Sequence, residues 1–299
     1  MRLATFDAGR GPRVAIIGSD GTLVPINDAI PEAPLDMLGV IEAGDALHAR
    51  LRDLATRASA GAKVATVRLL APIPRPRRNV FCVGWNYSEH FKEGARVRAT
   101  TGAAGRQEVP DFPALFSKNP ATVTGPDSPV WFPAPHSKEL DWEVELAVVI
   151  GRRGRDIGEE SAMSHVFGYT CANDVSVRDV QRRHGGQWFK GKNFDSHLPL
   201  GPWIVTADEL DPAALRIQTR VNGKTKQDSN TKFMVFKLPR LIREFSAGAE
   251  LEPGDIIITG TPEGVGFARK PPQFMKIGDT VEVEIEGIGV LRNTVQGRT

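Results

Sequence analysis

The sequence predicts a β-rich α+β protein, on three observations. Short apolar runs typical of strands dominate the chain after residue 79. Helical periodicity is confined to a few short stretches. These stretches do not alternate regularly with the strands, as they would in a doubly wound fold. The predicted strands cover 80–83, 142–150, 166–171, 203–205, 256–259 and 281–285, and the predicted helices cover about 86–93, 175–184 and 237–246.

The beginning of the chain predicts a small β-containing domain. Two apolar runs flank a Ser-Asp-Gly turn and favour a hairpin over 13–25. Leu47, Leu51 and Leu54 recur at helical spacing, which predicts a helix over about 44–58. Alternating prolines then indicate an extended connector. The predicted domains are therefore 1–71, a proline-rich linker at 72–78, and a larger domain at 79–299 that carries the candidate catalytic residues.

Composition excludes several classes of function. A formal net charge of +2 is too small for a nucleic-acid or membrane-surface protein. The chain has no apolar run of about 18 residues, the length of a transmembrane helix. Its N-terminus lacks an apolar signal core, and its two cysteines lie in apolar stretches without metal-site spacing. We therefore expect a cytoplasmic protein with buried, inert thiols.

The most informative segment is 141–150. Strand alternation puts Glu143 and Glu145 on one face, with Cα atoms roughly 6.6 Å apart, so that both can reach one cation. The same face continues into Ala147 and Val149, which indicates a strand buried on both sides. Two buried like charges are costly unless a cation or protons compensate them. On spacing alone, the alternative to a metal site is a strand whose acidic face is exposed to solvent. We interpret the acidic strand predicted over 281–285 in that way.

Asp174 adds a third carboxylate. It lies at the corner between a predicted strand and a predicted helix, a usual place for functional groups. Its alternative role is that of a helix N-cap. Ser176 and Asp179 have the spacing of a capping box, however, which would leave Asp174 free. Carboxylate sets without Cys or His suit Mg²⁺, Mn²⁺ or Ca²⁺ better than zinc.

Other polar residues have two interpretations each. His90 and Glu93 are neighbours on a predicted helix, where the carboxylate would support the imidazole as a general base; a surface pair is the alternative. Lys118 and Lys192 lie in loop-like contexts, where a lone lysine is nearly always at the surface. The segment 260–266 lacks the ending of a phosphate loop and favours a turn whose backbone amides bind a carboxylate.

From about 79 to 295 the chain closely resembles the fumarylacetoacetate hydrolase family, which includes acylpyruvate hydrolases and 2-hydroxyhepta-2,4-diene-1,7-dioate isomerases. Each motif is weak alone, but together, in the family's order, they are specific. They are Val83-Gly84-Trp85-Asn86-Tyr87 with His90 and Glu93, Leu115-Phe116-Ser117-Lys118, Glu143-Val144-Glu145-Leu146, Asn173-Asp174 with Arg178-Asp179-Val180-Gln181, Gly191-Lys192-Asn193-Phe194-Asp195, Val221-Asn222-Gly223, Pro253-Gly254-Asp255 and Gly260-Thr261-Pro262.

The resemblance implies a mixed β-sandwich roll, a homodimer, and a bound Mg²⁺ or Mn²⁺ held by Glu143, Glu145 and Asp174. It implies that His90 and Glu93 form a catalytic dyad on a lid that orders when substrate binds. The cation beside the reacting carbonyl would be Lys192. The residues implied to line the site of a small 2-oxo acid are Lys118, Arg178, Gln181 and Thr261.

The resulting hypothesis is a metal-dependent hydrolase that cleaves a C–C bond of an acylpyruvate. The 2-oxo acid chelates the metal, His90 and Glu93 activate water, and an enolate leaves. A decarboxylase or isomerase of unsaturated 2-oxo diacids is an alternative, because one fold hosts several reactions. A binding protein that kept the pocket is a weaker alternative, given the dyad and Lys192. The substrate stays open, because 94–112 is long and 184–188 lies where family sequences diverge.

Overall fold

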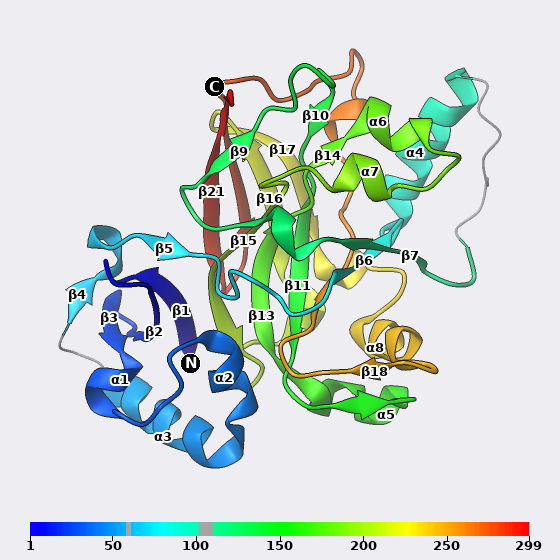
Figure 1. Cartoon of the computed structure of the whole chain (residues 1–299). Coiled ribbons are helices and arrows are strands. Elements are labelled where there is room, and N and C mark those ends of the chain that lie inside the picture. Colours follow the sequence, from blue (N-terminus) through cyan, green and yellow to red (C-terminus); the bar gives the residue numbers. More distant parts are fainter. Residues whose placement is uncertain (58–60, 102–109, 299) are drawn as a thin grey trace.

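Two β-sheets form the framework of the molecule (Figure 1). A computed structural model describes residues 1–57, 61–101 and 110–298, with only the backbone for 95–101. Within these ranges the larger sheet has twelve strands and the smaller has five. The predicted β-rich α+β class is therefore confirmed.

The larger sheet has the strand order β4-β3-β2-β1-β15-β13-β11-β19-β6-β7, with β5 on β1 and β8 on β15. Its N-terminal strands are β1 (Arg2–Asp7), β2 (Pro12–Ile17), β3 (Thr22–Pro25), β4 (Ala62–Lys63) and β5 (Leu69–Leu70). The others are β6 (Val80–Gly84), β7 (Ala114–Lys118), β8 (Val123–Thr124), β11 (Val144–Ile150), β13 (Val166–Asn173), β15 (Leu198–Thr206) and β19 (Ile256–Ile258). The predicted hairpin over 13–25 is confirmed by β2 and β3.

The smaller sheet packs against one face of the larger sheet. Its strands are β17 (Lys224–Asn230), β16 (Arg216–Val221), β20 (Thr280–Ile285), β21 (Gly289–Gln296) and β9 (Pro129–Trp131), in that order. Leu146 and Val148 of β11 share a buried apolar cluster with Ile217 and Val283 of this sheet. Burial alternates along β20, which leaves its glutamates partly exposed, as predicted for a solvent-facing acidic strand.

Strand β11 lies deep in the molecule. All of its residues are buried, and it pairs antiparallel with β13 on one side and β19 on the other. Burial on both faces is thus confirmed. The strand begins only at Val144, however, rather than at residue 142. The amides just before it donate to side chains instead, Trp142 N to Asp141 and Glu143 N to Asn173.

Short pairings and helices surround the two sheets. The two-stranded pairings are β10 (Leu140–Asp141) with β14 (Ser176–Val177), and β12 (Gly154–Arg155) with β18 (Glu250–Leu251). The helices are α1 (Ile26–Ala29), α2 (Met37–Glu42), α3 (Gly44–Arg57), α4 (Ser88–Thr101), α5 (Glu159–Ala162), α6 (Arg178–Arg183), α7 (Phe189–Lys192) and α8 (Leu238–Ser246). Helices α3 and α8 match their predicted positions closely.

Two helices differ from their predicted bounds. Helix α4 continues past residue 93 to Thr101. The prediction of a lid or disordered segment over 94–112 therefore falls partly on residues 102–109, which lie outside the described residues. Helix α6 starts at Arg178, because Ser176 belongs to strand β14. The Ser176 hydroxyl donates to the carbonyl of Asp174, so the predicted capping box is wrong.

The N-terminal strands extend the larger sheet, since β1 pairs with β15. The proline-rich connector packs against the rest of the protein. Pro72, Ile73 and Pro76 are buried, and Arg78 forms an ion pair with Asp255. The boundaries 1–71, 72–78 and 79–299 stay predictions.

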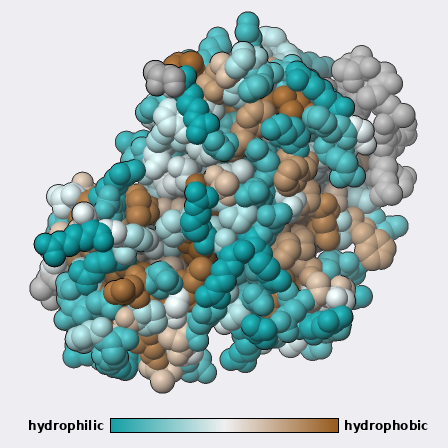
Figure 2. All heavy atoms as spheres, viewed as in Figure 1, coloured by the Kyte–Doolittle hydropathy of each residue, from teal (hydrophilic) through white to brown (hydrophobic). Residues whose placement is uncertain are grey.

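Among the described residues, no helix has the length and apolarity needed to cross a membrane. Polar and apolar side chains are interspersed on the face seen in Figure 2. Cys82 and Cys171 are free and buried, as expected.

Candidate metal centre and active site

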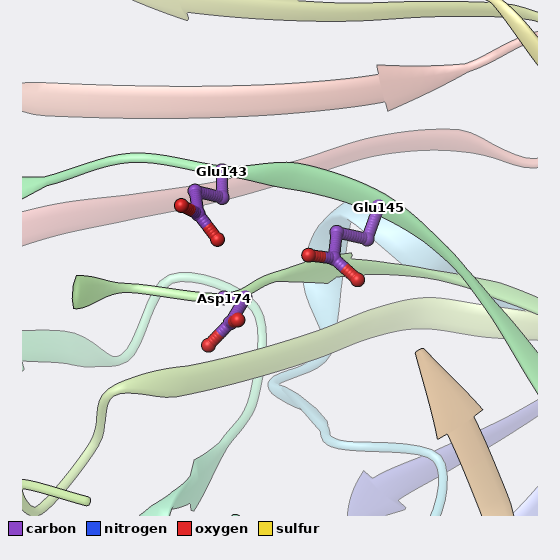
Figure 3. A group of neighbouring side chains, drawn as sticks. All are labelled: Glu143, Glu145 and Asp174. Carbon is purple, nitrogen blue, oxygen red and sulfur yellow. The ribbon is translucent and has the colours of Figure 1, made fainter. Parts of the chain in front are cut away.

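Three carboxylates converge inside the molecule (Figure 3). Glu145 lies on β11, Glu143 directly precedes that strand, and Asp174 directly follows β13. The antiparallel register pairs Val144 with Asn173, which brings the carboxylates to the same place. One oxygen from each lies within 4.8 Å of the others, and all three side chains are buried. The predicted convergence is therefore present in the structure.

Backbone groups hold this triad in position. The amide of Gly260 donates to Glu145 Oε2 over 2.6 Å. The Asp174 amide donates to the carbonyl of Glu143 over 2.9 Å, and this bond joins the two chain segments that carry the ligand candidates. The carboxylates are thus fixed by the sheet and the turn after β19, rather than by mobile side chains.

Two buried lysines contact the triad. Lys192, at the end of α7, donates to Glu143 Oε2 over 2.7 Å and to Asp174 Oδ2 over 2.5 Å. Lys118, at the end of β7, donates to Asp174 Oδ1 over 2.7 Å and to the carbonyl of Val175. Interpreting these lysines as surface residues is wrong. The carboxylates offset the cost of burying each ammonium, and the sheet places both lysines beside them.

Burial and neighbouring charge divide the two glutamates. Burial and the charges of Asp174 and Glu143 raise the pKa of Glu145 well above its ordinary value. Burial acts the same way on Glu143, but Lys192 and Arg178 outweigh it, so the pKa of Glu143 is lowered. Burial lowers the pKa of Lys118, whereas Asp174 and Glu143 overcome burial and raise the pKa of Lys192. A proton therefore binds to Glu145 more readily than to Glu143.

Arg178 joins the triad to a fourth buried carboxylate. Its Nη2 lies 2.6 Å from Glu143 Oε1, and its Nε donates to Asp141 Oδ2 over 2.8 Å. Its Nη1 donates to Gln181 over 3.2 Å. Sequence analysis did not assign a role to Asp141. The available signal was that Asp141 is the first acidic residue in the alternating pattern that includes Glu143.

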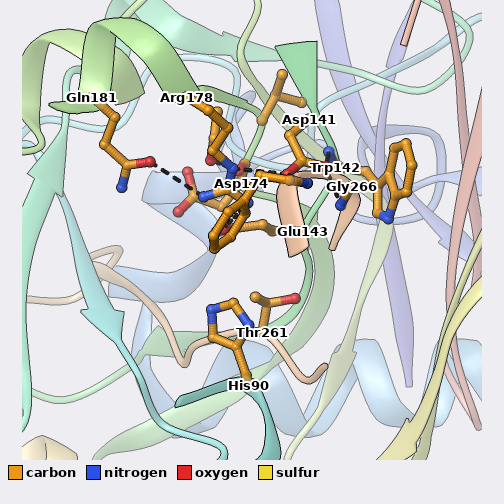
Figure 4. Close-up of polar contacts among 12 residues, drawn as sticks. His90, Asp141, Trp142, Glu143, Asp174, Arg178, Gln181, Thr261 and Gly266 are labelled. Atoms are coloured by element: carbon orange, nitrogen blue, oxygen red, sulfur yellow. Dashed lines mark hydrogen bonds and ion pairs between the residues drawn. The ribbon is translucent and has the colours of Figure 1, made fainter. Parts of the chain in front are cut away.

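The predicted dyad forms on α4. His90 Nδ1 lies 2.8 Å from Glu93 Oε1, and both Glu93 oxygens accept the amide of Gly264. Because an ionised carboxylate only accepts, Nδ1 is the donor in this contact, which leaves Nε2 as the ring atom that can exchange a proton with a ligand. The imidazole is buried and near enough to contribute to the lowered pKa of Glu143. In Figure 4 the His90 ring points toward the side where Glu143 lies.

The remaining predicted residues have these positions. Thr261 is buried in the turn after β19, and its hydroxyl accepts a hydrogen bond from Gln227. Gln181 is half-buried on α6 beside Arg178 (Figure 4). Lys118 is fully buried, and its ammonium donates a hydrogen bond to Asp174. The structure thus gathers all ten predicted site residues into one region, but Lys118 contacts a ligand candidate rather than an open surface.

The donor set fits a divalent cation of the Mg²⁺ or Mn²⁺ type. All three candidate ligands offer carboxylate oxygens, which such hard cations prefer. Four carboxylates and three cations are buried together in this region: Asp141, Glu143, Glu145 and Asp174 with Lys118, Arg178 and Lys192. With all four carboxylates ionised, the group carries one net negative charge, which a proton on Glu145 offsets in the absence of a metal. A divalent cation would reverse that sign and make the site attractive to an organic anion.

Comparison with known families matches residues 79–296 to the profile described as "Fumarylacetoacetate (FAA) hydrolase C-terminal". Among similar proteins, "Oxaloacetate tautomerase FAHD2A, mitochondrial" of Bos taurus is 46% identical over 301 residues, covering 99% of this chain and 91% of the relative. "Oxaloacetate tautomerase YisK" of Bacillus subtilis is 37% identical over 310 residues, covering 99% and 100%.

Solved structures are similar over whole chains. A putative HpcE protein from Mycobacterium smegmatis matches with a TM-score of 0.85 and 35% identity, covering 100% of both chains. A maleylpyruvate hydrolase from Sphingobium sp. SYK-6, in complex with manganese(II) and pyruvate, matches with a TM-score of 0.81 and 31% identity, also covering 100% of both. The similarity thus extends over the N-terminal strands as well as the site.

Proposed function

Because the chain belongs to the fumarylacetoacetate hydrolase family, we propose that it is a metal-dependent enzyme that interconverts the enol and keto forms of an oxaloacetate-type 2-oxo acid. Support comes from relatives called oxaloacetate tautomerases, which are similar over 99% of this chain. The comparisons support the C–C hydrolase hypothesis only at the level of the family. We therefore rank tautomerisation first. The observation that carries the proposal is a histidine–glutamate dyad beside a buried carboxylate triad.

In this proposal Glu143, Glu145 and Asp174 hold Mg²⁺ or Mn²⁺. Such a cation, when bound, would polarise the 2-oxo group and stabilise negative charge on its oxygen. Lys192 adds a second positive charge at the same place, since its ammonium touches two of the three carboxylates. The substrate would enter as an anion attracted by these charges.

Tautomerisation moves two protons. The enol loses the proton of its C2 hydroxyl and gains one at C3, so no water is consumed and no C–C bond breaks. His90 is suited to exchange the C3 proton through Nε2, because Glu93 orients the ring through Nδ1. Burial of the imidazole excludes competing water from that transfer. Thr261 and Gln181 are proposed to orient the substrate.

The test follows the loss of enol absorbance of oxaloacetate with Mn²⁺ present. His90→Ala should slow the reaction by about 10²–10⁴-fold, the usual range for a lost general acid–base group. His165→Ala is the control, since the His165 ring bonds to the carbonyl of Arg152 in a different part of the fold. Equal rates for His90→Ala and the parent protein would reject the dyad. Activity that survives full chelation would reject the metal centre.

Acylpyruvate hydrolysis is the second candidate. The His90–Glu93 pair also suits a base that activates water, and a maleylpyruvate hydrolase is similar over the full length of both chains. Oxygen-18 in the carboxylic product would identify hydrolysis, and release of CO₂ would identify decarboxylation. A non-enzymatic binding protein is the weakest alternative, because it needs neither the dyad nor Lys192.

Assembly and location stay predictions. We retain the homodimer and the sandwich-roll description as proposals, to be tested by light scattering and an experimental structure. The cytoplasmic location also stays a prediction, because the names of the mammalian relatives assign those proteins to mitochondria.

A further inference from the structure

The turn that follows β19 binds three carboxylates through its backbone. The amide of Gly260 donates to Glu145, over 2.6 Å. The amide of Gly264 donates to both oxygens of Glu93, over 3.0 and 3.2 Å. Further along, the amides of Gly266 and Phe267 donate to Asp141 over 2.7 and 3.0 Å. A metal-ligand candidate, the dyad carboxylate and a buried aspartate are thus attached to one short segment, 260–267.

Asp141 has a second connection. Its Oδ2 accepts both the Phe267 amide and the Nε of Arg178, which lies 2.8 Å away. Arg178 in turn places Nη2 2.6 Å from Glu143, and the Phe267 ring lies 4.5 Å from its guanidinium. Asp141 is fully buried, so no water competes for these bonds. Its carboxylate therefore lies between Arg178, which contacts Glu143, and the turn that seats Glu93 (Figure 4).

The turn has little freedom to adjust around Asp141. A Cβ at Gly266 would lie 2.6 Å from Asp141 Oδ1 and 2.0 Å from the carbonyl of Gln273. Because Gly266 has no room to shift, a displacement of the Asp141 carboxylate would also displace the turn. If the carboxylate of Asp141 is lost, the amides of Trp142, Gly266 and Phe267 lose their acceptor, and the segment that holds Glu93 loses its bonds to Asp141.

We propose that Asp141 is a positioning residue that fixes the distance between the dyad and the metal-ligand carboxylates. It acts through Arg178 on Glu143 and through Gly266 and Phe267 on the turn, and it contacts no substrate. This inference rests on the proposed role of the dyad. Displacement of a general base by about 1 Å costs up to about 10²-fold in rate, so a residue of this kind affects turnover strongly.

The experiment measures kcat, KM and Mn²⁺ affinity for Asp141→Asn. The amide keeps the shape but turns an acceptor into a donor facing other donors. We expect kcat to fall roughly 10- to 100-fold, with a much smaller change in KM and in Mn²⁺ affinity, the latter transmitted through Arg178 to Glu143. Asp255→Asn is the matched control: Asp255 is also buried, pairs with Arg78 and accepts the amide of Glu252, but lies away from the turn. This control should lose stability while retaining kcat.

A double-mutant cycle with Glu93→Gln decides how Asp141 acts. If both residues place the same base, Asp141→Asn should add little loss in the Glu93→Gln background. Losses that multiply in full would overturn the proposal, as would a parent-like kcat for Asp141→Asn. If Asp141→Asn does not fold, Asp141→Glu replaces it in the same cycle, because it keeps the charge and displaces the oxygens. If Glu93→Gln itself is fully active, the proposed function fails instead, which separates the two failures.

Discussion

At the scale of single residues, Lys192 differs most from its predicted environment. The sequence suggested a lysine in a glycine-flanked loop that contributes little to the core. The structure buries its ammonium between Glu143 and Asp174. The ammonium of Lys192 therefore offsets the negative charge of two buried carboxylates. In the proposed function it also lies where negative charge would develop on a substrate.

We predict that Lys192→Met lowers both turnover and stability. Removing one partner of a buried pair costs about 3–5 kcal/mol, because the remaining charges are left uncompensated. Added Mn²⁺ should recover part of that loss, since it supplies positive charge to the same carboxylates. Urea unfolding with and without Mn²⁺ measures both effects. Lys190→Met, on the same helix but exposed, should change stability by less than about 0.5 kcal/mol.

A second prediction at this scale concerns pH. Because burial and the nearby carboxylates of Asp174 and Glu143 raise the pKa of Glu145, the metal-free protein keeps a proton there above the ordinary pKa of a glutamate. That protonated form stabilises the metal-free fold below the ordinary pKa, and the contribution is lost as pH rises through the raised one. A divalent cation needs the ionised form and so displaces the proton.

Affinity for Mn²⁺ should therefore rise with pH through this range, and the increase in melting temperature on adding Mn²⁺ should grow with it. Calorimetry in two buffers of different ionisation enthalpy counts the released proton. Glu145→Gln should bind Mn²⁺ more weakly and release no proton from this position. An affinity that does not change with pH would contradict the prediction.

Sequence reasoning located the candidate ligands because alternation and burial are local properties. Glu143 and Glu145 are two residues apart on one chain segment, and the apolar residues after them revealed burial on both faces. The burial of Lys118 and the role of Asp141 depend on partners far along the chain, at Asp174 and at Gly266. No local pattern distinguishes such a lysine from one at the surface.

At the scale of elements, the turn after β19 joins the middle of α4 to the sheet through the bonds from Gly264 to Glu93, in addition to the direct chain connection from β6. Gly264 has φ +97°, a conformation that other residues rarely adopt, and a Cβ there would lie 2.3 Å from the carbonyl of Lys226. The amide that holds Glu93 therefore depends on the absence of a side chain. Sequence analysis predicted that amides of this segment bind a carboxylate, and the carboxylates bound in the structure are the protein's own.

We predict that Gly264→Ala lowers kcat by moving the amide away from Glu93, in addition to a strain of about 1–3 kcal/mol. Gly278→Ala is the control, because Gly278 has φ +94° and no atom within 4 Å of an added Cβ. Both variants should lose stability through backbone strain, but only Gly264→Ala should lose turnover. Steady-state kinetics at saturating Mn²⁺, together with thermal unfolding, separates the effects. Parent-like turnover in Gly264→Ala would remove the turn from the mechanism.

Elements with strong periodicity or uniform apolarity were predicted correctly, including the short strands β6 and β19, whereas strands held only by distant pairing were not. Helices α3 and α8 and strand β11 are close to their predicted bounds. The two-residue strands β10 and β14 were missed, because they are held by pairing with each other across more than thirty residues of chain. That pairing also removes Ser176 from the start of α6, which explains the failed capping box.

At the scale of the whole molecule, the first 71 residues are integrated into the larger sheet. Strand β1 hydrogen-bonds to β15, with Leu3 opposite Ile204. A single buried apolar cluster contains side chains from both parts of the chain. It includes Leu3, Val14, Ile16, Met37 and Val40 from the first part, with Ala147, Val149, Leu200, Ile204 and Ile256 from the second. The sequence could indicate a boundary from its prolines, but not that the core continues across it.

The last prediction follows from this shared core: residues 79–299 should not fold stably when expressed alone. Removing 1–78 would uncover the edge of β15 and expose apolar side chains such as Val149 and Ile256, which are now buried. Each fully buried aliphatic side chain is worth about 1.5–3 kcal/mol, so exposing several of them exceeds the usual total stability of about 5–15 kcal/mol. The exposed edge would also favour aggregation.

Size-exclusion chromatography and thermal unfolding of the 79–299 fragment measure the outcome. We expect aggregation or a broad, non-cooperative transition, whereas the full chain should unfold in one step. Co-expression of 1–78 with 79–299 is the control, because it returns the missing strands and the buried linker without the covalent connection and should restore a soluble complex that binds Mn²⁺. A fragment that is monodisperse and melts cooperatively at the temperature of the full chain would show instead that 1–71 is an independent addition. The metal centre would then owe its rigidity to the second part of the chain alone.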